Sequence, residues 1–323
     1  MYHRPIMVKE VVEILEPLPD GVHVDGTVGG GGHALAVAQE MDERGLVIAI
    51  DRDAEALQKA RETLEDVRPR VEFLRGDWRN IHRHLGDLEI TSIDSALLDL
   101  GVSSHQLDTP RRGFSYANRN APLDMRMDLD SPITAAKVVN EYAEGDLTRI
   151  IKTYGEERWA SRIADFIVRK RPMQTVGELV DAIKAAIPAS ARREGPHPAR
   201  RTFQALRMEV NRELEGFEEG LMRLIETLTP GGRMAVITFH SLEDRPVKRV
   251  FRYLSRECRC PPDLPVCVCG GPVARDLTRH PVTPGDEEIT DNPRSRSAKL
   301  RAIELVRDAS EVLRGRREIS RWQ

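Results

Sequence analysis

Apolar and polar positions follow two different rhythms along the first hundred residues. Short runs of aliphatic residues, such as Leu46–Ile50 and Ile93–Leu98, alternate with longer segments that have an apolar residue every three or four positions, such as Val8–Leu15 and Ala54–Leu64. The short runs have the length and composition of buried strands, and the longer segments have the period of amphipathic helices. This alternation predicts a parallel sheet with helices on both faces.

The strand pattern breaks off after residue 110, and the next hundred residues show only helical spacing, as at Leu147, Ile150 and Ile151. Strands return at Met234–Phe239 and Ala298–Leu305, and we expect the last strand to close the sheet at its edge. A chain of 323 residues exceeds the usual size of one hydrophobic core, which favours a large insertion. The predicted parts are a discontinuous Rossmann-like α/β core at 1–110 and 215–306, a helical insertion at 111–214 and a charged tail at 307–323.

A glycine-rich turn follows the first predicted strand. Residues 22–33 read Val-His-Val-Asp-Gly-Thr-Val-Gly-Gly-Gly-Gly-His, with five glycines within seven positions. Glycine allows sharp turns and leaves backbone N–H groups exposed to a ligand. The dinucleotide fingerprint G-x-G-x-x-G would need a glycine at 35, where this chain has Leu35. The pattern therefore favours S-adenosylmethionine, a nucleoside cofactor without phosphate, over a nicotinamide dinucleotide.

An acid stands at or just beyond the end of each of the first four predicted strands. These acids are Asp25, Asp51, Asp77 and Asp99. Ligands of open α/β sheets bind outside the carboxyl ends of the strands, where an acid can hold the ribose hydroxyls. Helix capping is the alternative for any one of them. Four in succession favour a cofactor site.

The predicted insertion contains residues suited to RNA. Residues 113–128 mix aromatics, amides and arginines without a period, and we interpret Phe114 and Tyr116 as base-stacking residues and Arg126 as a phosphate contact. Anchoring of this loop to the core by the two rings is the alternative.

A basic segment follows in the same insertion. Between residues 192 and 212 lie six arginines and His197, against two acids. We interpret the segment as a track for RNA phosphates, with a solvated helix face as the alternative. The candidate residues from this segment are Arg200, Arg201 and Arg207.

All four cysteines lie within twelve residues, as Cys258-Arg-Cys260 and Cys267-Val-Cys269. Disulfides are disfavoured in a reducing cytoplasm, and four close thiolates suit a structural zinc ion. The C-x-C spacing differs from the commoner C-x-x-C, so four reduced cysteines holding a loop are the alternative.

The composition and the first residues of the chain exclude some classes of protein. The chain has 49 basic and 52 acidic residues, a net charge of −3, which argues against a globally basic nucleic-acid binder and allows local patches. No apolar run approaches membrane-spanning length. The first residues lack the apolar stretch of a signal peptide, so we expect a cytoplasmic protein that does not enter the membrane.

In combination, these motifs resemble the bacterial ribosomal RNA small-subunit methyltransferase H family. The resemblance spans nearly the whole chain. It rests on His3-x-Pro5, Asp25–His33, Asp51–Asp53, Leu98–Asp108, Gly113–Ser115, Phe239–Asp244 and Asn292–Lys299.

The resemblance implies a class I methyltransferase that moves a methyl group from S-adenosylmethionine to the N4 exocyclic amine of one cytidine in the decoding region of small-subunit (16S) ribosomal RNA. The implied partner is this RNA or the small ribosomal subunit, and a homodimer is left open. With Trp78 expected to stack on adenine, the implied cofactor contacts are Gly31, Gly32, His33, Asp51, Trp78, Asp99 and Gln106.

The chemistry of the transfer can be reasoned from the residues themselves. A cytosine amine is a poor nucleophile because its lone pair is delocalised into the ring, so positioning should dominate the rate. Asp99 is the first candidate for orienting the amine or for holding the methionine end of the cofactor. His240 is a candidate proton acceptor, with a hydrogen-bonded structural role as the alternative. A non-catalytic RNA-binding ribosome-assembly factor would explain the basic segment but would need no cofactor site.

Overall fold

The chain forms two compact units, which we call unit 1 and unit 2. Unit 1 comprises His3–Gly101 and Gly216–Gln323, and unit 2 comprises Val102–Glu215. The unit borders thus fall at 101/102 and 215/216, where the sequence pattern predicts 110/111 and 214/215. The computed structural model describes residues 5–192, 197–260, 265–310 and 312–313.

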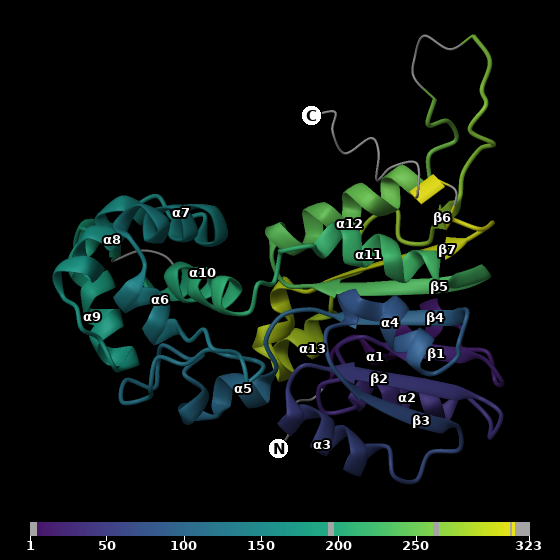
Figure 1. The fold of residues 1–323 in the computed structure, drawn as a ribbon, viewed down its shortest axis with the longest axis horizontal. Helices are drawn as coiled ribbons and strands as arrows, with labels where there is room; N and C mark the ends of the chain where they lie inside the picture. Colours follow the sequence, from purple (N-terminus) through teal and green to yellow (C-terminus); the bar gives the residue numbers. More distant parts are fainter. Residues whose placement is uncertain (1–4, 193–196, 261–264, 311, 314–323) are drawn as a thin grey trace. The chain divides into compact units, whose positions relative to one another are not determined.

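Unit 1 is built on a seven-stranded sheet with the order β3-β2-β1-β4-β5-β7-β6 (Figure 1). Strands β1 to β5 pair in parallel, whereas β7 is antiparallel to both of its neighbours. The strands are β1 (Val22–Asp25), β2 (Leu46–Asp51), β3 (Arg70–Arg75), β4 (Ile93–Asp99), β5 (Leu228–Thr238), β6 (Ala274–Asp276) and β7 (Lys299–Leu305). The predicted α/β class is confirmed.

The prediction that the last strand closes the sheet is wrong, because β7 lies inside the sheet and β6 forms the edge. Strand β6 has only three residues. So short a strand has no readable hydrophobic period, which is why the sequence pattern did not reveal it.

Both faces of the sheet are buried, because successive side chains of a strand point to opposite sides. In β2, Val47 and Ala49 belong to one hydrophobic cluster, and Ile48 and Ile50 belong to another. The first cluster is shared with α1 to α3, and the second with α4, α11 and α12, so each set of helices covers one face. These helices are α1 (Val8–Leu15), α2 (Gly32–Gln39), α3 (Ala54–Thr63), α4 (Ile81–Asp87), α11 (Phe217–Glu226) and α12 (Ser241–Leu254).

The segments after α12 complete unit 1. The short helix α13 (Asp286–Asp291) precedes β7. Part of the predicted charged tail packs on the core, since Ala309 and Leu313 are buried there. Residues 314–323 lie outside the described residues.

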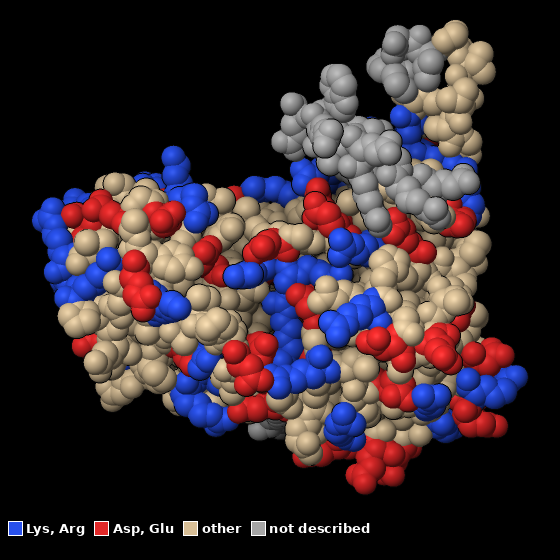
Figure 2. Space-filling model, viewed as in Figure 1, with Lys and Arg blue, Asp and Glu red and all other residues tan. Residues whose placement is uncertain are grey.

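Unit 2 is helical and has its own core. Residues such as Val139, Ile151, Ile163 and Leu206 form one buried cluster, because each helix presents one apolar stripe to the others. Its helices are α5 (Ser104–Asp108), α6 (Ala135–Glu141), α7 (Glu144–Gly155), α8 (Ala160–Arg169), α9 (Val176–Ala186) and α10 (Arg200–Val210). In Figure 2, basic and acidic side chains are interspersed on the visible face. Among the helices that the structure describes, none has the length and apolar character needed to cross a membrane.

Candidate functional site

The four acids predicted at strand ends lie along the edge of the sheet that is formed by the carboxyl ends of its parallel strands. Asp25, Asp51 and Asp99 are the last residues of β1, β2 and β4, and Asp77 follows β3 by two positions. The four strands run parallel, so their carboxyl ends point the same way. The glycine-rich loop between β1 and α2 starts at the same edge. This edge of unit 1 is the candidate cofactor site.

Asp51 links the glycine-rich loop to the loop after β2. Its Oδ2 accepts the N–H of Gly29 and its Oδ1 accepts the N–H of Asp53, each at 2.9 Å. Burial raises the pKa of Asp51 to about 6, although these two N–H donors act in the opposite direction. The carboxyl is therefore ionised at neutral pH. Its remaining lone pairs suit the ribose hydroxyls of an adenosine.

Asp25 is buried behind the same loop, with 1% of its surface exposed, and its Oδ1 accepts the N–H of Thr27 at 3.1 Å. Burial raises the pKa of Asp25 to about 8, with smaller contributions from the charges of Asp99 and Asp51, against the effect of the Thr27 hydrogen bond. Asp25 is thus mostly protonated at neutral pH. It holds the turn closed and adds little negative charge to the edge.

Packing accounts for two of the loop glycines. A Cβ on Gly31 would lie 3.2 Å from the backbone of α3, and one on Gly32 would lie 2.7 Å from Cγ of Pro5. Gly31 also has a φ of +84°, a conformation that residues with side chains rarely adopt. A Cβ on Gly29, in contrast, would meet only one heavy atom within 4 Å, at 3.9 Å. The loop is close-packed at the start of α2 and open at Gly29, as a nucleoside-binding loop requires.

His33 connects the first described segment of the chain to the end of β4. Its Nε2 lies 2.7 Å from the carbonyl oxygen of Ile6, and since a carbonyl only accepts, Nε2 carries the proton. Burial lowers the pKa of His33, so the ring is neutral at pH 7. Its Nδ1 lies 3.6 Å from Oδ2 of Asp99, whose own N–H donates to Oγ1 of Thr27 at 2.6 Å. The Thr27 hydrogen bond fixes the backbone of Asp99 at the end of β4, while the unprotonated Nδ1 of His33 lies near its carboxyl without donating a hydrogen bond to it.

Asp77 and Trp78 follow β3, and both make internal contacts. Burial raises the pKa of Asp77, but the guanidinium groups of Arg79 and Arg52 lower it by more, so the net shift is downward. Trp78 is 6% exposed and packs edge-on against Phe217, with ring centroids 5.5 Å apart. The indole therefore belongs to the core, and the burial of the ring argues against the stacking on adenine that the resemblance implies.

His240 lies at the start of α12, directly after the chain leaves β5. Its Nε2 is 2.9 Å from Oε1 of Glu243, a residue that is only 3% exposed. The other oxygen of Glu243 accepts the N–H of Phe239 at 3.1 Å. This contact fixes the imidazole in one orientation, which both a structural histidine and a proton acceptor need.

Gln106 lies in unit 2, where it shapes the local backbone. Its Oε1 accepts the N–H of Ser103 at 3.1 Å, and its own N–H donates to Oγ of Ser103 at 3.2 Å. This reciprocal pair is a capping box at the start of α5. The cofactor contact that the resemblance implies for Gln106 stays a prediction.

The two aromatic residues proposed to stack on RNA bases differ in their surroundings. Phe114 is 5% exposed and belongs to the core of unit 2, which corrects the expectation that its ring is open to a base. Tyr116 is half-buried and stacks in parallel on His197, with centroids 4.5 Å apart. Phe203 meets Tyr116 edge-on at 5.9 Å. Only Tyr116 of the pair retains a partly exposed ring.

Two of the four candidate arginines in unit 2 are engaged in internal contacts, which corrects their assignment as phosphate contacts. Arg126 donates to the carboxylate of Asp124 and to two backbone carbonyls, at distances of 2.6 to 3.0 Å. Arg207 forms a bidentate pair with Glu213, at 2.8 and 2.7 Å. Arg200 and Arg201 begin α10 and are exposed, although Arg201 also donates to a backbone carbonyl of unit 2 at 3.1 Å.

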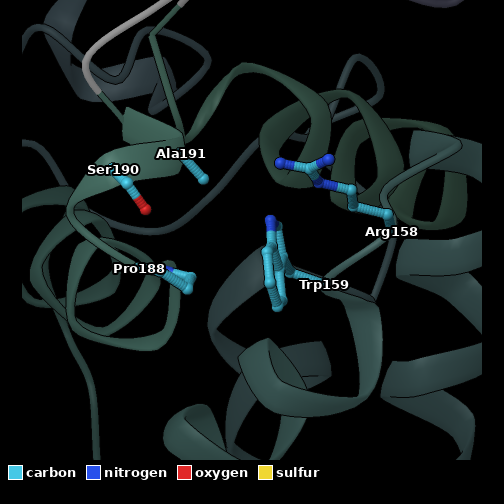
Figure 3. Close-up of a pocket in the computed structure, with 5 residues that line it drawn as sticks. All are labelled: Arg158, Trp159, Pro188, Ser190 and Ala191. Carbon is cyan, nitrogen blue, oxygen red and sulfur yellow. The ribbon is translucent and has the colours of Figure 1, made fainter.

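Unit 2 also contains a pocket of about 450 Å³ that the sequence did not indicate. Figure 3 shows the indole of Trp159 pointing into it, with Arg158 and Pro188 on either side. The guanidinium of Arg158 lies 5.1 Å from the centroid of the indole. The other lining residues are Ser190 and Ala191, so no predicted site residue contributes. Its two lining segments are about thirty positions apart, and no local motif marks such a site.

Known proteins resemble this chain over nearly its whole length. The family model described as the MraW methylase family matches residues 1–306. Several relatives carry the name Ribosomal RNA small subunit methyltransferase H, including those of three organisms. That of Pelobacter propionicus is 55% identical over 309 residues, covering 94% of this chain and 98% of the relative. That of Heliobacterium modesticaldum is 53% identical over 311 residues, covering 95% and 99%. That of Symbiobacterium thermophilum is 51% identical over 315 residues, covering 96% and 99%.

These matches confirm the resemblance found in the sequence. The open glycine-rich loop and the ionised carboxyl of Asp51 suit the adenosine part of S-adenosylmethionine, the methyl donor of such a methylase. The chain belongs to the MraW methylase family.

Proposed function

We propose that this chain transfers a methyl group from S-adenosylmethionine to the N4 amine of a cytidine in the decoding region of small-subunit (16S) ribosomal RNA. The main observation behind the proposal is that Asp51 and Asp99, at the carboxyl ends of β2 and β4, flank the open loop at Gly29. The names of the relatives support small-subunit ribosomal RNA as the substrate. The motif resemblance supports the cytidine N4 position.

The residues of unit 1 suggest how the cofactor is held. S-adenosylmethionine supplies a methyl group made electrophilic by its sulfonium sulfur. Asp51 would accept hydrogen bonds from the ribose hydroxyls, and the first turn of α2 offers backbone N–H groups that have no intrahelical acceptor. Asp99, whose backbone N–H donates to Thr27, would hold the methionine end or orient the target amine.

The target base needs positioning more than activation by a strong base. A cytosine inside a helix cannot present its amine to a cofactor site, so the base must be unstacked or flipped. His240 would take up the proton released from the amine, and the carboxylate of Glu243 at 2.9 Å would stabilise the resulting imidazolium.

Unit 2 is our candidate for RNA recognition. Tyr116, stacked on His197, offers an aromatic surface, and Arg200 and Arg201 offer exposed positive charge at the start of α10. Stacking and phosphate contacts of this kind are how proteins hold unpaired RNA. The cytoplasmic location expected from the sequence agrees with such a substrate.

The test is transfer of radiolabelled methyl groups to small ribosomal subunits that lack the modification, followed by nucleoside analysis. Wild type is compared with Asp99→Asn and with a matched control, Asp94→Asn. Asp94 lies near the opposite end of the same strand, where its Oδ2 accepts the N–H of Val22 at 2.8 Å. We expect N4-methylcytidine with wild type and control, and a rate lower by roughly 100-fold or more with Asp99→Asn.

Cofactor binding by each variant is measured separately by calorimetry. Normal transfer by Asp99→Asn would remove Asp99 from the mechanism and leave the function standing. Absence of label with wild type, on subunits and on naked RNA alike, would refute the proposed function in favour of a non-catalytic assembly factor.

A further inference from the structure

The four cysteines converge in the loop between α12 and β6, which extends from the edge of the sheet (Figure 1). Their four Sγ atoms all lie within 4.8 Å of one another. Three of the separations are 3.6 Å for Cys258–Cys267, 3.9 Å for Cys260–Cys267 and 3.4 Å for Cys267–Cys269. Two C-x-C pairs separated by six residues thus form one compact sulfur cluster.

These separations match a tetrahedral metal site. Zinc–thiolate bonds of about 2.3 Å place the sulfur atoms of a tetrahedron about 3.8 Å apart. The observed values of 3.4 to 3.9 Å lie around that figure. A disulfide would instead bring one sulfur pair to about 2.05 Å.

The backbone around the cluster is arranged for thiolates. The N–H of Arg259 donates to Sγ of Cys269 at 3.2 Å, and the N–H of Val268 donates to Sγ of Cys260 at 3.3 Å. Each C-x-C pair therefore receives a hydrogen bond from the other. Such outer hydrogen bonds orient metal ligands and stabilise their negative charge.

Two guanidinium groups adjoin the cluster. Arg259 donates to the carbonyl of Cys269 at 3.1 Å, and Arg307 donates to the carbonyls of Cys269 and Gly271, at 2.9 Å each. A divalent ion with four thiolates carries a net charge of −2, which two nearby guanidinium groups offset. Arg307 follows β7, so this contact also joins the loop to the sheet.

No apolar core holds this loop. None of the residues described between 255 and 272 is buried, and Val266 and Val268 are 70% and 77% exposed. A segment that buries so little apolar surface needs another source of stability, and small folds often obtain it from a metal ion.

We propose that Cys258, Cys260, Cys267 and Cys269 bind one Zn²⁺ ion as four thiolates. The four thiols release their protons to solvent on binding, and no redox step is involved. With all four positions filled by protein ligands, the ion is structural and has no open site for chemistry. This proposal is independent of the proposed function.

The test uses the full chain without a histidine tag and without exposure to chelator. Elemental analysis should find about one zinc per chain in the wild type. The variant Cys258→Ser/Cys267→Ser should lose the zinc, while the control Val266→Ser, which changes an exposed side chain of the same loop, should keep it. Replacement of zinc by Co²⁺ should give the absorption bands of a tetrahedral thiolate site. No cysteine lies elsewhere in the chain, so such bands can only come from this loop.

Three results would overturn the proposal. The first is wild-type protein without metal whose four thiols all react with a thiol reagent. The second is protein with two disulfides, seen as a mass lower by four hydrogens. The third is zinc that remains in full in the double cysteine variant. If that variant fails to fold, the zinc content and cobalt spectrum of the wild type still decide the question.

Discussion

Replacing Asp51 by asparagine should weaken S-adenosylmethionine binding and leave the fold intact. Asparagine has nearly the same shape but only one acceptor oxygen and no charge. One of the two N–H groups that Asp51 accepts, from Gly29 and Asp53 at 2.9 Å each, would then face an NH₂ group. The ribose would also lose a charged acceptor. A hydrogen bond to a charged group is worth about 1.5–3 kcal/mol, so the Kd should rise roughly 10- to 150-fold.

The same carboxyl predicts a pH dependence of binding. Because the pKa of Asp51 is about 6, roughly nine tenths of the molecules carry it ionised at pH 7 and roughly one tenth at pH 5. If the ionised form binds the ribose, affinity should fall about tenfold between pH 7 and pH 5. Asp25, with a pKa of about 8, stays mostly protonated over this range, and Asp77, with a lowered pKa, stays ionised. Neither should contribute to the slope.

Calorimetry at pH 5, 6 and 7, at constant ionic strength, checks both effects. Asp51→Asn should bind weakly with little dependence on pH, while Asp94→Asn should behave like wild type. The ionisation of Asp51 affects folding stability in the opposite direction to cofactor binding. Because the pKa of Asp51 is raised in the folded chain, its protonated carboxyl stabilises the fold fully below pH 3.8, and this stabilisation is lost as the pH rises through 6. Asp51→Asn has no such pH-dependent contribution, but one N–H of Gly29 or Asp53 loses its acceptor, so the free energy of unfolding should fall by about 1–3 kcal/mol.

Two results would refute this reasoning. A Kd for Asp51→Asn within twofold of wild type would show that the carboxylate does not bind the cofactor. An unchanged pH slope in the variant would assign the slope to another group, and the buried ring of His33 would be the next to test.

Three further predictions concern packing, acid stability and RNA binding. Gly32→Ala should lower the free energy of unfolding by about 1–3 kcal/mol, because the added methyl would lie 2.7 Å from Pro5, and an unchanged urea midpoint would contradict this. Burial lowers the pKa of His23 to about 3, so His23 takes up a proton mainly when the chain unfolds. The free energy of unfolding should therefore fall by up to about 5 kcal/mol as the pH drops from 6.5 to 3. A variant with glutamine at this position should lose that part of the pH slope in denaturant titrations. The double variant Arg200→Ala/Arg201→Ala should weaken RNA binding and reduce its salt dependence by roughly 1.5 to 2 in the log–log slope, and an unchanged slope would exclude an RNA contact by this pair.

The elements of the sheet were predictable because their signals are local. The helix Val8–Leu15 has the predicted bounds, and β2 extends the predicted Leu46–Ile50 by one residue. The acids at the strand ends were predictable for the same reason, because an apolar run followed by an acid can be recognised from a few adjacent residues. The edge strand β6 was not predicted, because a strand of three residues is too short to show an alternating hydrophobic pattern.

The arginines and aromatic residues of unit 2 could not be assigned from the local sequence alone. Arg207 has the same charge whether it faces solvent or pairs with Glu213, and only the fold brings that carboxylate within 2.7 Å. Phe114 has the same ring whether it stacks on a base or lies in the core, and its 5% exposure depends on helices far along the chain. Composition identifies the chemistry available to a segment but not its contacts.

By itself, the sequence determined the α/β class, the alternation of strands and helices in the first hundred residues, the positions of the acids and glycines, and the pairing of cysteines into two C-x-C motifs. These features depend on neighbouring residues, whose spacing is the same in the folded and the unfolded chain. Only the tertiary structure decided the pKa of Asp25 near 8, the neutral ring of His33, and the convergence of four sulfur atoms within 4.8 Å. Burial, charge and contact distance depend on residues that meet only when the chain has folded.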